Sequence, residues 1–397
     1  MAVIIVGGGI GGLSLALALA RRGVGSTLIE QAGAIQAVGA GIQLSPNATR
    51  LLIGWGLETP ITAAAVEPER AEVRDAVSGR LLLTNRLGGY ARERWGAPYL
   101  TLTRSALQGL LLEAVEASGR VELRLGARIA AVEVDTPAAV LEGGERIVGE
   151  ALIGCDGLHS VVQAAVVGAR SPRFTGQTAW RGLALMGEAD PLVQVFTGPR
   201  SHFVRYPVGG GLVNMVAVKQ ASADEVEAWD AAGTREELTA AFADWPDAVR
   251  ATIAAAERPW RQALYARSPL PCWTKGRATL LGDAAHPMLP FLAQGAAMAI
   301  EDADALAGLL AGAADMPAAL LDYQDERLAR TAKVQRWAER NAALFHLPSP
   351  AARTAFAAAA FADGVTGQPA EARLDWLYGY RRDGLSPHPR LRRTLPI

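Results

Sequence analysis

The N-terminal segment, residues 2–30, constrains the fold of this chain more than any other part of it. A short apolar run at 2–6 leads directly into Gly7-Gly8-Gly9-Ile10-Gly11-Gly12, which fits the pattern G-x-G-x-x-G. Residues 13–22 are rich in Ala and Leu and contain neither Pro nor Gly, which predicts a helix. Residues 26–29 predict a second strand that ends at Glu30. This order of elements is typical of a βαβ unit that binds a dinucleotide.

The three glycines of the pattern have distinct physical roles. Gly7 allows a tight turn out of the strand, Gly9 lets a pyrophosphate approach the backbone, and Gly12 lets the helix pack closely on the strand. Unpaired N–H groups at the helix N-terminus favour phosphates. Glu30 lies about 20 residues beyond the glycines, where a carboxylate can accept hydrogen bonds from a ribose. The alternative is an α/β unit without a nucleotide, in which the glycines serve packing only.

Composition narrows the classes of function. The chain has 397 residues and a formal net charge of -1, which favours neither a nucleic acid nor an anionic membrane surface as partner. No apolar run approaches the roughly 20 residues of a membrane span. No basic segment precedes the first strand, so we expect no signal peptide. Cys155 and Cys272 fit a reducing cytoplasm and form no metal-binding pattern.

The middle of the chain predicts a second sheet of a different kind. Residues 174–270 contain strand-like runs without alternating helices, which favours a mixed or antiparallel sheet. Residues 66–83 predict a hairpin around Ser78-Gly79. The expected fold is α/β, or α+β overall, with a Rossmann-like nucleotide-binding domain, an inserted β-sheet substrate domain and C-terminal helices. The nucleotide-binding domain is expected at 1–72, 100–173 and 271–330. The substrate domain is expected at 73–99 and 174–270, and the C-terminal helices at 331–397.

Two aspartates follow predicted strands and are candidates for a ligand site. Asp156 comes after the apolar run 151–154, and Asp283 comes after the run 277–281. In open α/β sheets, ligands bind beyond the carboxyl ends of the strands, where both side chains would lie. An ordinary turn is the alternative for Asp156.

Other candidates lie in glycine-rich segments and at helix starts. Gly41 belongs to a stretch whose backbone could approach a ligand, although a plain surface loop fits as well. Arg104 could reach a phosphate or a ring from the start of a predicted helix, or it could be an exposed arginine. Gly295 and Ala296 begin another helix, whose positive end could stabilise negative charge on a bound ring.

Three of these segments together resemble the fingerprints of the single-component FAD-dependent aromatic hydroxylases. They are residues 7–30, the motif Asp156-Gly157-x-x-Ser160 and the pair Gly282-Asp283. The run GDAAHPMLPFLAQGAAMAIEDADAL at 282–306 is similar to the branch that holds salicylate hydroxylase, 3-hydroxybenzoate 6-hydroxylase and 6-hydroxynicotinate 3-monooxygenase. The motif His202-x-x-x-Tyr206-Pro207 fits the same branch.

The resemblance implies bound FAD and assigns residues to it. Its positions, together with Gly41, give a candidate set of Gly7, Gly9, Gly12, Glu30, Gly41, Arg104, Asp156, Asp283, Gly295 and Ala296. His202 and Tyr206 match a pair that touches the ring hydroxyl of the substrate in relatives. Pro290 would shape the wall beside the reactive edge of the ring. Gln163 stands where the second fingerprint usually has an arginine, so an ion pair that braces this motif is expected to be missing.

The implied activity is that of a flavoprotein monooxygenase. It would hydroxylate a small phenolic aromatic or heteroaromatic acid with NAD(P)H and dioxygen, through a flavin hydroperoxide. NAD(P)H would bind only transiently, because no second strand–GxGxxG–helix unit is found. His202 could take the phenol proton, since the ordinary pKa of an imidazole is about 6.5. The partners expected are a small aromatic substrate, NAD(P)H and dioxygen, acting on a cytoplasmic monomer or homodimer.

Several alternatives stay open at this stage. His202 could be a packed strand residue, and Tyr206 could fill core space. His286 is expected to brace the loop of Asp283, and Arg181 either lies near the flavin or pairs with an acid. No cation is obviously placed to meet a substrate carboxylate. An FAD-dependent oxidase or dehydrogenase without oxygen insertion and a non-catalytic flavin-binding protein are the competing functions.

Overall fold

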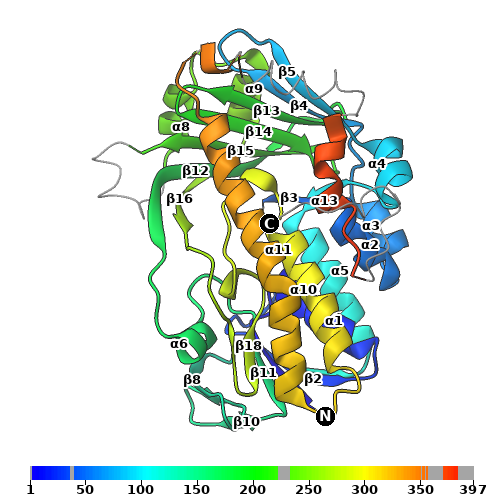
Figure 1. Ribbon diagram of the computed structural model, residues 1–397. Coiled ribbons are helices and arrows are strands. Elements are labelled where there is room, and N and C mark those ends of the chain that lie inside the picture. Colours follow the sequence, from blue (N-terminus) through cyan, green and yellow to red (C-terminus); the bar gives the residue numbers. More distant parts are fainter. Residues whose placement is uncertain are drawn as a thin grey trace.

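Two large sheets, joined by long helices, form the molecule in this computed structural model (Figure 1). The structure describes residues 2–35, 40–221, 233–349, 351–353, 355 and 370–382. Sheet I has the strand order β17 (Thr274–Lys275), β18 (Ala278–Leu280), β11 (Ala151–Gly154), β1 (Ala2–Val6), β2 (Gly25–Ile29) and β7 (Val121–Arg124). All its pairs are parallel except β17–β18. The predicted βαβ unit is confirmed, with β1 and β11 buried as the apolar strands of a parallel sheet are.

Helices pack on sheet I in a layer. Helix α1 (Ile10–Ala20) contacts both α5 (Arg104–Ala117) and α10 (Gly295–Leu310). Helix α2 (Pro46–Gly54) contacts α10 as well, and α3 (Glu58–Ala64) contacts α5. The two-stranded sheet of β3 (Gly41–Leu44) and β6 (Leu100–Thr103) and the three-stranded sheet of β10 (Arg146–Val148), β9 (Ala138–Leu141) and β8 (Ile129–Glu133) complete this part, with α6 (Val161–Val167).

Sheet II is the mixed sheet that the middle of the chain predicts. Its strand order is β16 (Trp260–Ala266), β12 (Arg173–Leu185), β15 (Leu212–Gln220), β14 (Ser201–Pro207), β13 (Leu192–Gly198), β4 (Arg70–Asp75) and β5 (Leu81–Arg86). Only the β13–β4 pair is parallel. One face packs on α8 (Arg235–Ala241) and α9 (Asp247–Ala255) through Trp180, Phe203 and Phe242. The other face, toward sheet I, carries His202 and Tyr206.

One helix connects the two sheets. Helix α11 (Met316–Phe345) runs along α10 and continues to sheet II, as the orange ribbon of Figure 1 shows. Beyond it, residues 370–374 and 375–378 form only a 3-10 turn (Ala370–Leu374) and a single helical turn, α13 (Asp375–Tyr378). Helix α4 (Gly88–Trp95) packs beside this turn through Trp95, whose ring lies edge-on to Tyr378.

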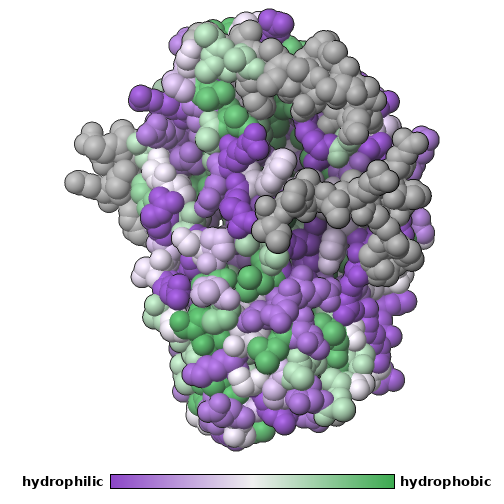
Figure 2. Space-filling model, viewed as in Figure 1, coloured by the Kyte–Doolittle hydropathy of each residue, from purple (hydrophilic) through white to green (hydrophobic). Residues whose placement is uncertain are grey.

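The surface seen from the same side is mixed in character. Hydrophobic residues lie scattered among hydrophilic ones on this face (Figure 2), which is the ordinary pattern of a protein surface. Among the described residues, no helix is both long enough and apolar enough to cross a membrane.

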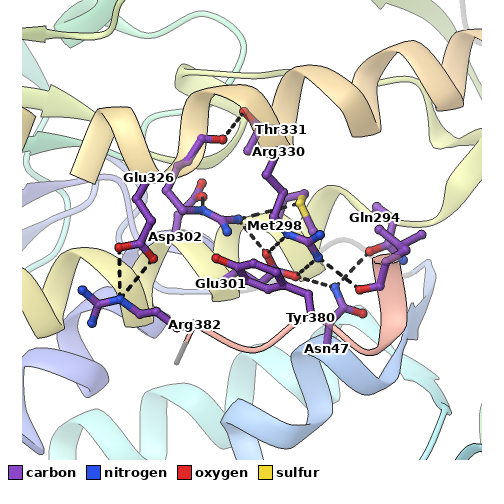
Figure 3. A network of polar contacts seen from close by, with 12 residues as sticks. Asn47, Gln294, Met298, Glu301, Asp302, Glu326, Arg330, Thr331, Tyr380 and Arg382 are labelled. Carbon is purple, nitrogen blue, oxygen red and sulfur yellow. Dashed lines mark hydrogen bonds and ion pairs between the residues drawn. The ribbon is translucent and has the colours of Figure 1, made fainter. Parts of the chain in front are cut away.

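Buried ion pairs fix α10 against α11 (Figure 3). Arg327 pairs with Glu301 at 2.8 Å and with Asp302 at 2.7 Å, and all three side chains are almost fully buried. Arg330 adds a second contact to Glu301 at 2.6 Å. Burial alone would raise the pKa of Asp302, but His286 and Arg327 lower it to about 2. Asp302 is therefore ionised in the folded protein at neutral pH.

We predict that Asp302→Ala lowers the free energy of unfolding by about 3–5 kcal/mol, because it leaves Arg327 with one buried partner fewer. The stability that ionised Asp302 adds is present above its ordinary pKa of 3.8 and is lost as the pH falls toward about 2. The difference between wild type and variant in urea unfolding should therefore shrink between these pH values. The control is Asp304→Ala, whose more exposed pair with Arg22 should contribute at most about 1 kcal/mol. Equal losses in both variants would contradict this assignment.

Candidate functional site

A cavity of about 1550 Å³ lies between the carboxyl ends of the strands of sheet I and the inner face of sheet II. It is larger than the roughly 300–1,000 Å³ of an ordinary small-molecule site, so it has room for two ligands. The predicted site residues that line it are Gly7, Gly9, Glu30, Gly41, Arg104, Asp156, His202, Tyr206, Asp283, Pro290, Gly295 and Ala296. Gly12 is the predicted residue that does not line it.

The glycines of the turn after β1 differ in their surroundings: some pack tightly against the backbone, and one faces open space. A Cβ at Gly12 would lie 1.9 Å from the carbonyl oxygen of Gly7, and a Cβ at Gly7 would lie 2.5 Å from the carbonyl oxygen of Cys155. A Cβ at Gly9, in contrast, would meet no atom of the described residues within 4 Å. The backbone at Gly9 is therefore open to a ligand, whereas Gly7 and Gly12 are required by close backbone packing.

Glu30 is held in one orientation at the end of β2. Its Oε2 accepts a hydrogen bond from the backbone N–H of Gly8 at 2.7 Å, and its Oε1 accepts one from Ala32 at 2.8 Å. Each carboxylate oxygen has a second lone pair, so the group can still accept a hydrogen bond from a hydroxyl of a ligand in the cavity.

Asp156 and Asp283 lie at the ends of neighbouring strands and differ in their contacts. Asp156 accepts hydrogen bonds from the Ser160 hydroxyl and, at 2.7 Å, from the Val161 N–H, and burial raises its pKa. The Asp283 carboxylate has no hydrogen-bond partner among the described residues and faces the cavity. Burial raises the pKa of Asp283, and His286 and Arg104 offset this only in part.

The loop that carries Asp283 is braced from two sides. His286 is buried and pairs with Asp302 at 2.5 Å, while Asp302 also accepts a hydrogen bond from the N–H of Gly282 at 3.2 Å. Gln163 donates from its Nε2 to the carbonyl oxygen of Ala284 at 3.0 Å. The glutamine therefore contacts this loop through a neutral hydrogen bond, at the position where the sequence predicted the loss of an ion pair.

The start of α10 points its unpaired N–H groups toward the cavity, which Gly295 and Ala296 line. The side-chain amide of Asn47 donates a hydrogen bond to Glu301 at 2.7 Å and another to Gln294 at 3.2 Å (Figure 3). Gln294 immediately precedes the helix, so the ion pairs of α10 and α11 extend to its first turn.

A row of side chains across sheet II forms an apolar wall of the cavity. The register aligns Val73, Val195, Val204, Val216 and Arg181 on five adjacent strands. All five line the cavity. The wall is therefore apolar along its length and ends at a guanidinium.

Arg181 is a cation of the cavity wall whose lack of a partner among the described residues the sequence did not reveal. Its Nε is buried without a hydrogen-bond partner, and among the described residues no group pairs with the guanidinium. Burial lowers the pKa of Arg181, and the neighbouring Arg104 lowers it further while Tyr206 raises it. The position could have been found from the alternation along its strand, which places Arg181 on the same face as Ala179 and Leu183.

His202 belongs to a chain of hydrogen bonds that the sequence also did not reveal. It is 2% exposed, and its Nδ1 lies 2.7 Å from Nε2 of His346, at the end of α11. The other nitrogen of His346 lies 2.9 Å from the side-chain amide of Gln177. Burial, and then His346, hold the pKa of His202 well below its ordinary value. His202 is therefore neutral at neutral pH.

Tyr206 lies four residues further along β14 on the same face, about 13 Å from His202 along the strand. It is buried, and burial raises the pKa of its hydroxyl well above the ordinary value, although Arg181 opposes this. Tyr99 lines the cavity beside it and donates to Gln43 at 2.7 Å. The apolar wall thus has a neutral imidazole toward one end and phenol hydroxyls toward the other.

Comparison with known proteins identifies this arrangement. Residues 1–338 match the family model described as FAD binding domain. The chain is 38% identical over 392 residues to 3-amino-4-hydroxybenzoate 2-monooxygenase PtnB3 of Streptomyces platensis, covering 95% of this chain and 96% of that protein. It is 36% identical over 387 residues to 3-hydroxybenzoate 6-hydroxylase 1 of Aquipseudomonas alcaligenes, covering 95% and 97%.

Solved structures agree with the sequence relatives. The structure of Klebsiella pneumoniae HpxO complexed with FAD and uric acid has a TM-score of 0.81 at 25% identity, covering 95% of this chain and 96% of that one. A salicylate hydroxylase substrate complex has a TM-score of 0.77 at 25% identity, covering 96% of both. The chain with this two-sheet cavity therefore belongs to the FAD-binding-domain family of flavoprotein monooxygenases.

Proposed function

We propose that this protein uses FAD, NAD(P)H and dioxygen to hydroxylate a small aromatic acid that carries a ring hydroxyl. The observation that carries the proposal is the single cavity that joins the glycine turn of sheet I to the apolar wall of sheet II. The relatives named above act on 3-amino-4-hydroxybenzoate and 3-hydroxybenzoate. Both compounds combine a ring hydroxyl with a carboxylate, and the wall offers a group for each.

The residues on the sheet I side fit FAD. The open space over Gly9 and the first N–H groups of α1 would receive the pyrophosphate, and Glu30 would bind the ribose. Arg104, Asp283 and the start of α10 would hold the flavin half. When bound, FAD would take a hydride from NAD(P)H and then use dioxygen to insert one oxygen atom into the substrate.

The substrate ring would lie against the valines of sheet II. The backbones of His202 and Arg181 lie about 12 Å apart. This is the diagonal over two strand spacings of about 4.8 Å across the sheet and two residues of about 3.3 Å along the strand. Both side chains extend from the same face into the gap, which leaves the length of a hydroxybenzoate between them. Arg181 would bind the carboxylate, and Nε2 of His202 would accept the hydrogen bond or the proton of the ring hydroxyl.

Other parts of the proposal follow from the sequence. NAD(P)H would visit the cavity only during reduction, because sheet I carries the single dinucleotide turn found in the chain. The free thiols of Cys155 and Cys272 fit a cytoplasmic protein. Asp156 would line the nicotinamide approach, Pro290 the reactive edge of the ring, and Tyr206 the end of the wall that lies away from His202. The protein would act as a monomer or homodimer.

The test is NAD(P)H consumption by the purified FAD-loaded protein with hydroxybenzoates, amino-hydroxybenzoates and hydroxynicotinates, with product masses measured. The proposal expects one added oxygen atom in one of these acids. Stimulated NAD(P)H oxidation that yields hydrogen peroxide with every compound would instead favour an oxidase. No reduction with any compound would favour a flavin-binding protein without catalysis.

We predict that Gly9→Val folds but does not retain FAD, because the added branch would occupy space that no protein atom fills. Visible flavin absorbance after gel filtration measures retention, and circular dichroism checks the fold. Gly109→Val is the matched control, since a Cβ there also meets no protein atom but lies in α5 outside the cavity lining. A normal flavin spectrum in Gly9→Val would refute the placement of the pyrophosphate.

Arg181→Met should weaken binding of the acid substrate about 10–150-fold, the equivalent of the roughly 1.5–3 kcal/mol of a hydrogen bond to a charged group. Binding of the matching phenol without a carboxylate should change little, which provides an internal control. Arg181→Lys should keep part of the preference for the acid. Titration of flavin absorbance with each ligand measures the dissociation constants. An equal loss for acid and phenol would exclude the carboxylate contact.

His202→Ala should keep FAD and lower the rate of coupled hydroxylation by about 10²–10⁴-fold, the usual contribution of a positioned proton acceptor. NAD(P)H oxidation should continue and yield hydrogen peroxide. Product and peroxide are quantified from the same reaction. Unchanged hydroxylation would remove His202 from the mechanism.

A further inference from the structure

His202 is enclosed in a way that limits what it can do alone. Its ring packs against Phe291 and Phe345, with centroids 5.1 and 5.4 Å away. Since it is 2% exposed, an imidazolium at this position would be poorly solvated. Its Nε2 has no partner among the described residues, and the residue lines the cavity. A base that must become a buried cation after taking a proton is a weak base.

His346 offers a place for that charge. Its Nε2 lies 2.7 Å from Nδ1 of His202, and the rings lie 4.9 Å apart at 36°. His346 caps the C-terminus of α11, where the negative end of the helix dipole favours a cation. It is also less buried than His202. Burial still lowers the pKa of His346, to about 4, so this half-buried ring would hold the proton only transiently and then release it to water.

Gln177 completes the chain and sets its direction. Its Nε2 lies 2.9 Å from Nδ1 of His346, while its Oε1 is buried and has no partner in the part of the chain that the structure describes. If Nε2 donates to His346, His346 carries its hydrogen on Nε2 and donates to His202, which then presents N–H to the cavity. With the side-chain amide of Gln177 reversed, Oε1 accepts a hydrogen bond from Nδ1–H of His346, and Nε2 of His346 accepts one from Nδ1–H of His202. Only this second arrangement leaves Nε2 of His202 with a free lone pair that can take a proton.

We propose that His346 and Gln177 set the tautomer of His202 and relay the proton of the substrate hydroxyl away from the cavity. This inference rests on the proposed function. The substrate O–H bond breaks and its proton binds Nε2 of His202, while the Nδ1 proton of His202 moves to Nε2 of His346. The electron pair stays on the substrate oxygen, and the positive charge appears on His346, whose Nδ1–H donates to Oε1 of Gln177. His346 is thus a positioning residue that acts through His202.

The main experiment measures ionisation of a bound phenol without turnover. FAD-loaded protein is titrated with 3-hydroxybenzoate at a series of pH values in the absence of NAD(P)H, and the phenolate is followed by its ultraviolet absorbance. His346→Phe should raise the apparent pKa of the bound hydroxyl by at least one unit and lower coupled hydroxylation about 10–100-fold. The KM should change less than about threefold, because His346 does not touch the substrate.

Two further variants separate a relay from simple packing. His346→Gln can hold a hydrogen bond to His202 but cannot carry the proton, so it should restore the thermal stability lost in His346→Phe without restoring the phenol pKa. Gln177→Glu should bring hydroxylation to at least the wild-type rate, since a carboxylate supports a charged His346. Glu339→Ala, on the exposed side of α11, serves as the control.

The outcomes distinguish this inference from the proposed function. If no aromatic acid is hydroxylated by the wild-type protein, the proposed function fails. If the wild type hydroxylates but His346→Phe and His346→Gln both ionise the bound phenol as the wild type does, the relay is refuted. If the relay operates, the double variant His202→Ala/His346→Phe should lose no more of the coupled hydroxylation rate than His202→Ala loses by itself. If the fold-loss in the double variant instead equals the product of the two single-variant losses, His346 acts independently of His202, and the relay is overturned.

Discussion

The buried pairing of Arg327 with Glu301 and Asp302 supports both ends of the cavity. It locks α10 to α11, because sliding either helix would separate charges that have no water to replace their partners. Through Asn47 and Gln294 the network reaches the first turn of α10, on the proposed flavin side. Helix α11 continues from the same network to His346, beside His202. One cluster of charges therefore positions the helix start and the histidine chain together.

The cavity divides its polar groups according to the ligands proposed for each end. The sheet I end offers backbone N–H groups, Glu30 and Asp283, which suit phosphate, ribose and flavin. The sheet II end offers a valine wall, two neutral proton-bearing groups and Arg181. An unpaired guanidinium in such surroundings is costly until an anion meets it. A neutral phenol would leave that cost in place, so the proposed site would favour an acid both through its contacts and through the charge that a phenol leaves unpaired.

Much of this organisation is predictable from local sequence. The glycine turn, the strand ends with Asp156 and Asp283, and the start of α10 are short motifs whose geometry follows from neighbouring residues. The structure brings nearly all of them to one cavity. The expected loss of support at Gln163 did not take account of the carbonyl of Ala284, which accepts the amide. No local pattern marks that contact.

The groups that sequence reasoning missed depend on distant partners. His346 follows a long amphipathic helix and reads as the start of a loop, and only the length and direction of α11 bring it to His202. Arg181 is visible as an alternating strand residue, yet its lack of a partner among the described residues is a property of the packed sheet. Within the C-terminal segment expected to be helical, residues 370–378 form only short turns, held by tertiary contacts such as Arg330 with the carbonyl oxygens of Trp376 and Leu377. Residues 356–369 and 383–397 of that expected helical segment lie outside the described residues.

The central claim is that FAD and a hydroxylated aromatic acid occupy this one cavity together, with the acid held between Arg181 and His202. The most direct measurement is an experimental structure of the protein with FAD and 3-hydroxybenzoate. The account predicts the carboxylate within about 3.2 Å of the Arg181 guanidinium and the ring hydroxyl within about 3.2 Å of Nε2 of His202. A ring bound with its carboxylate away from Arg181, or a flavin that fills the wall of sheet II, would contradict it.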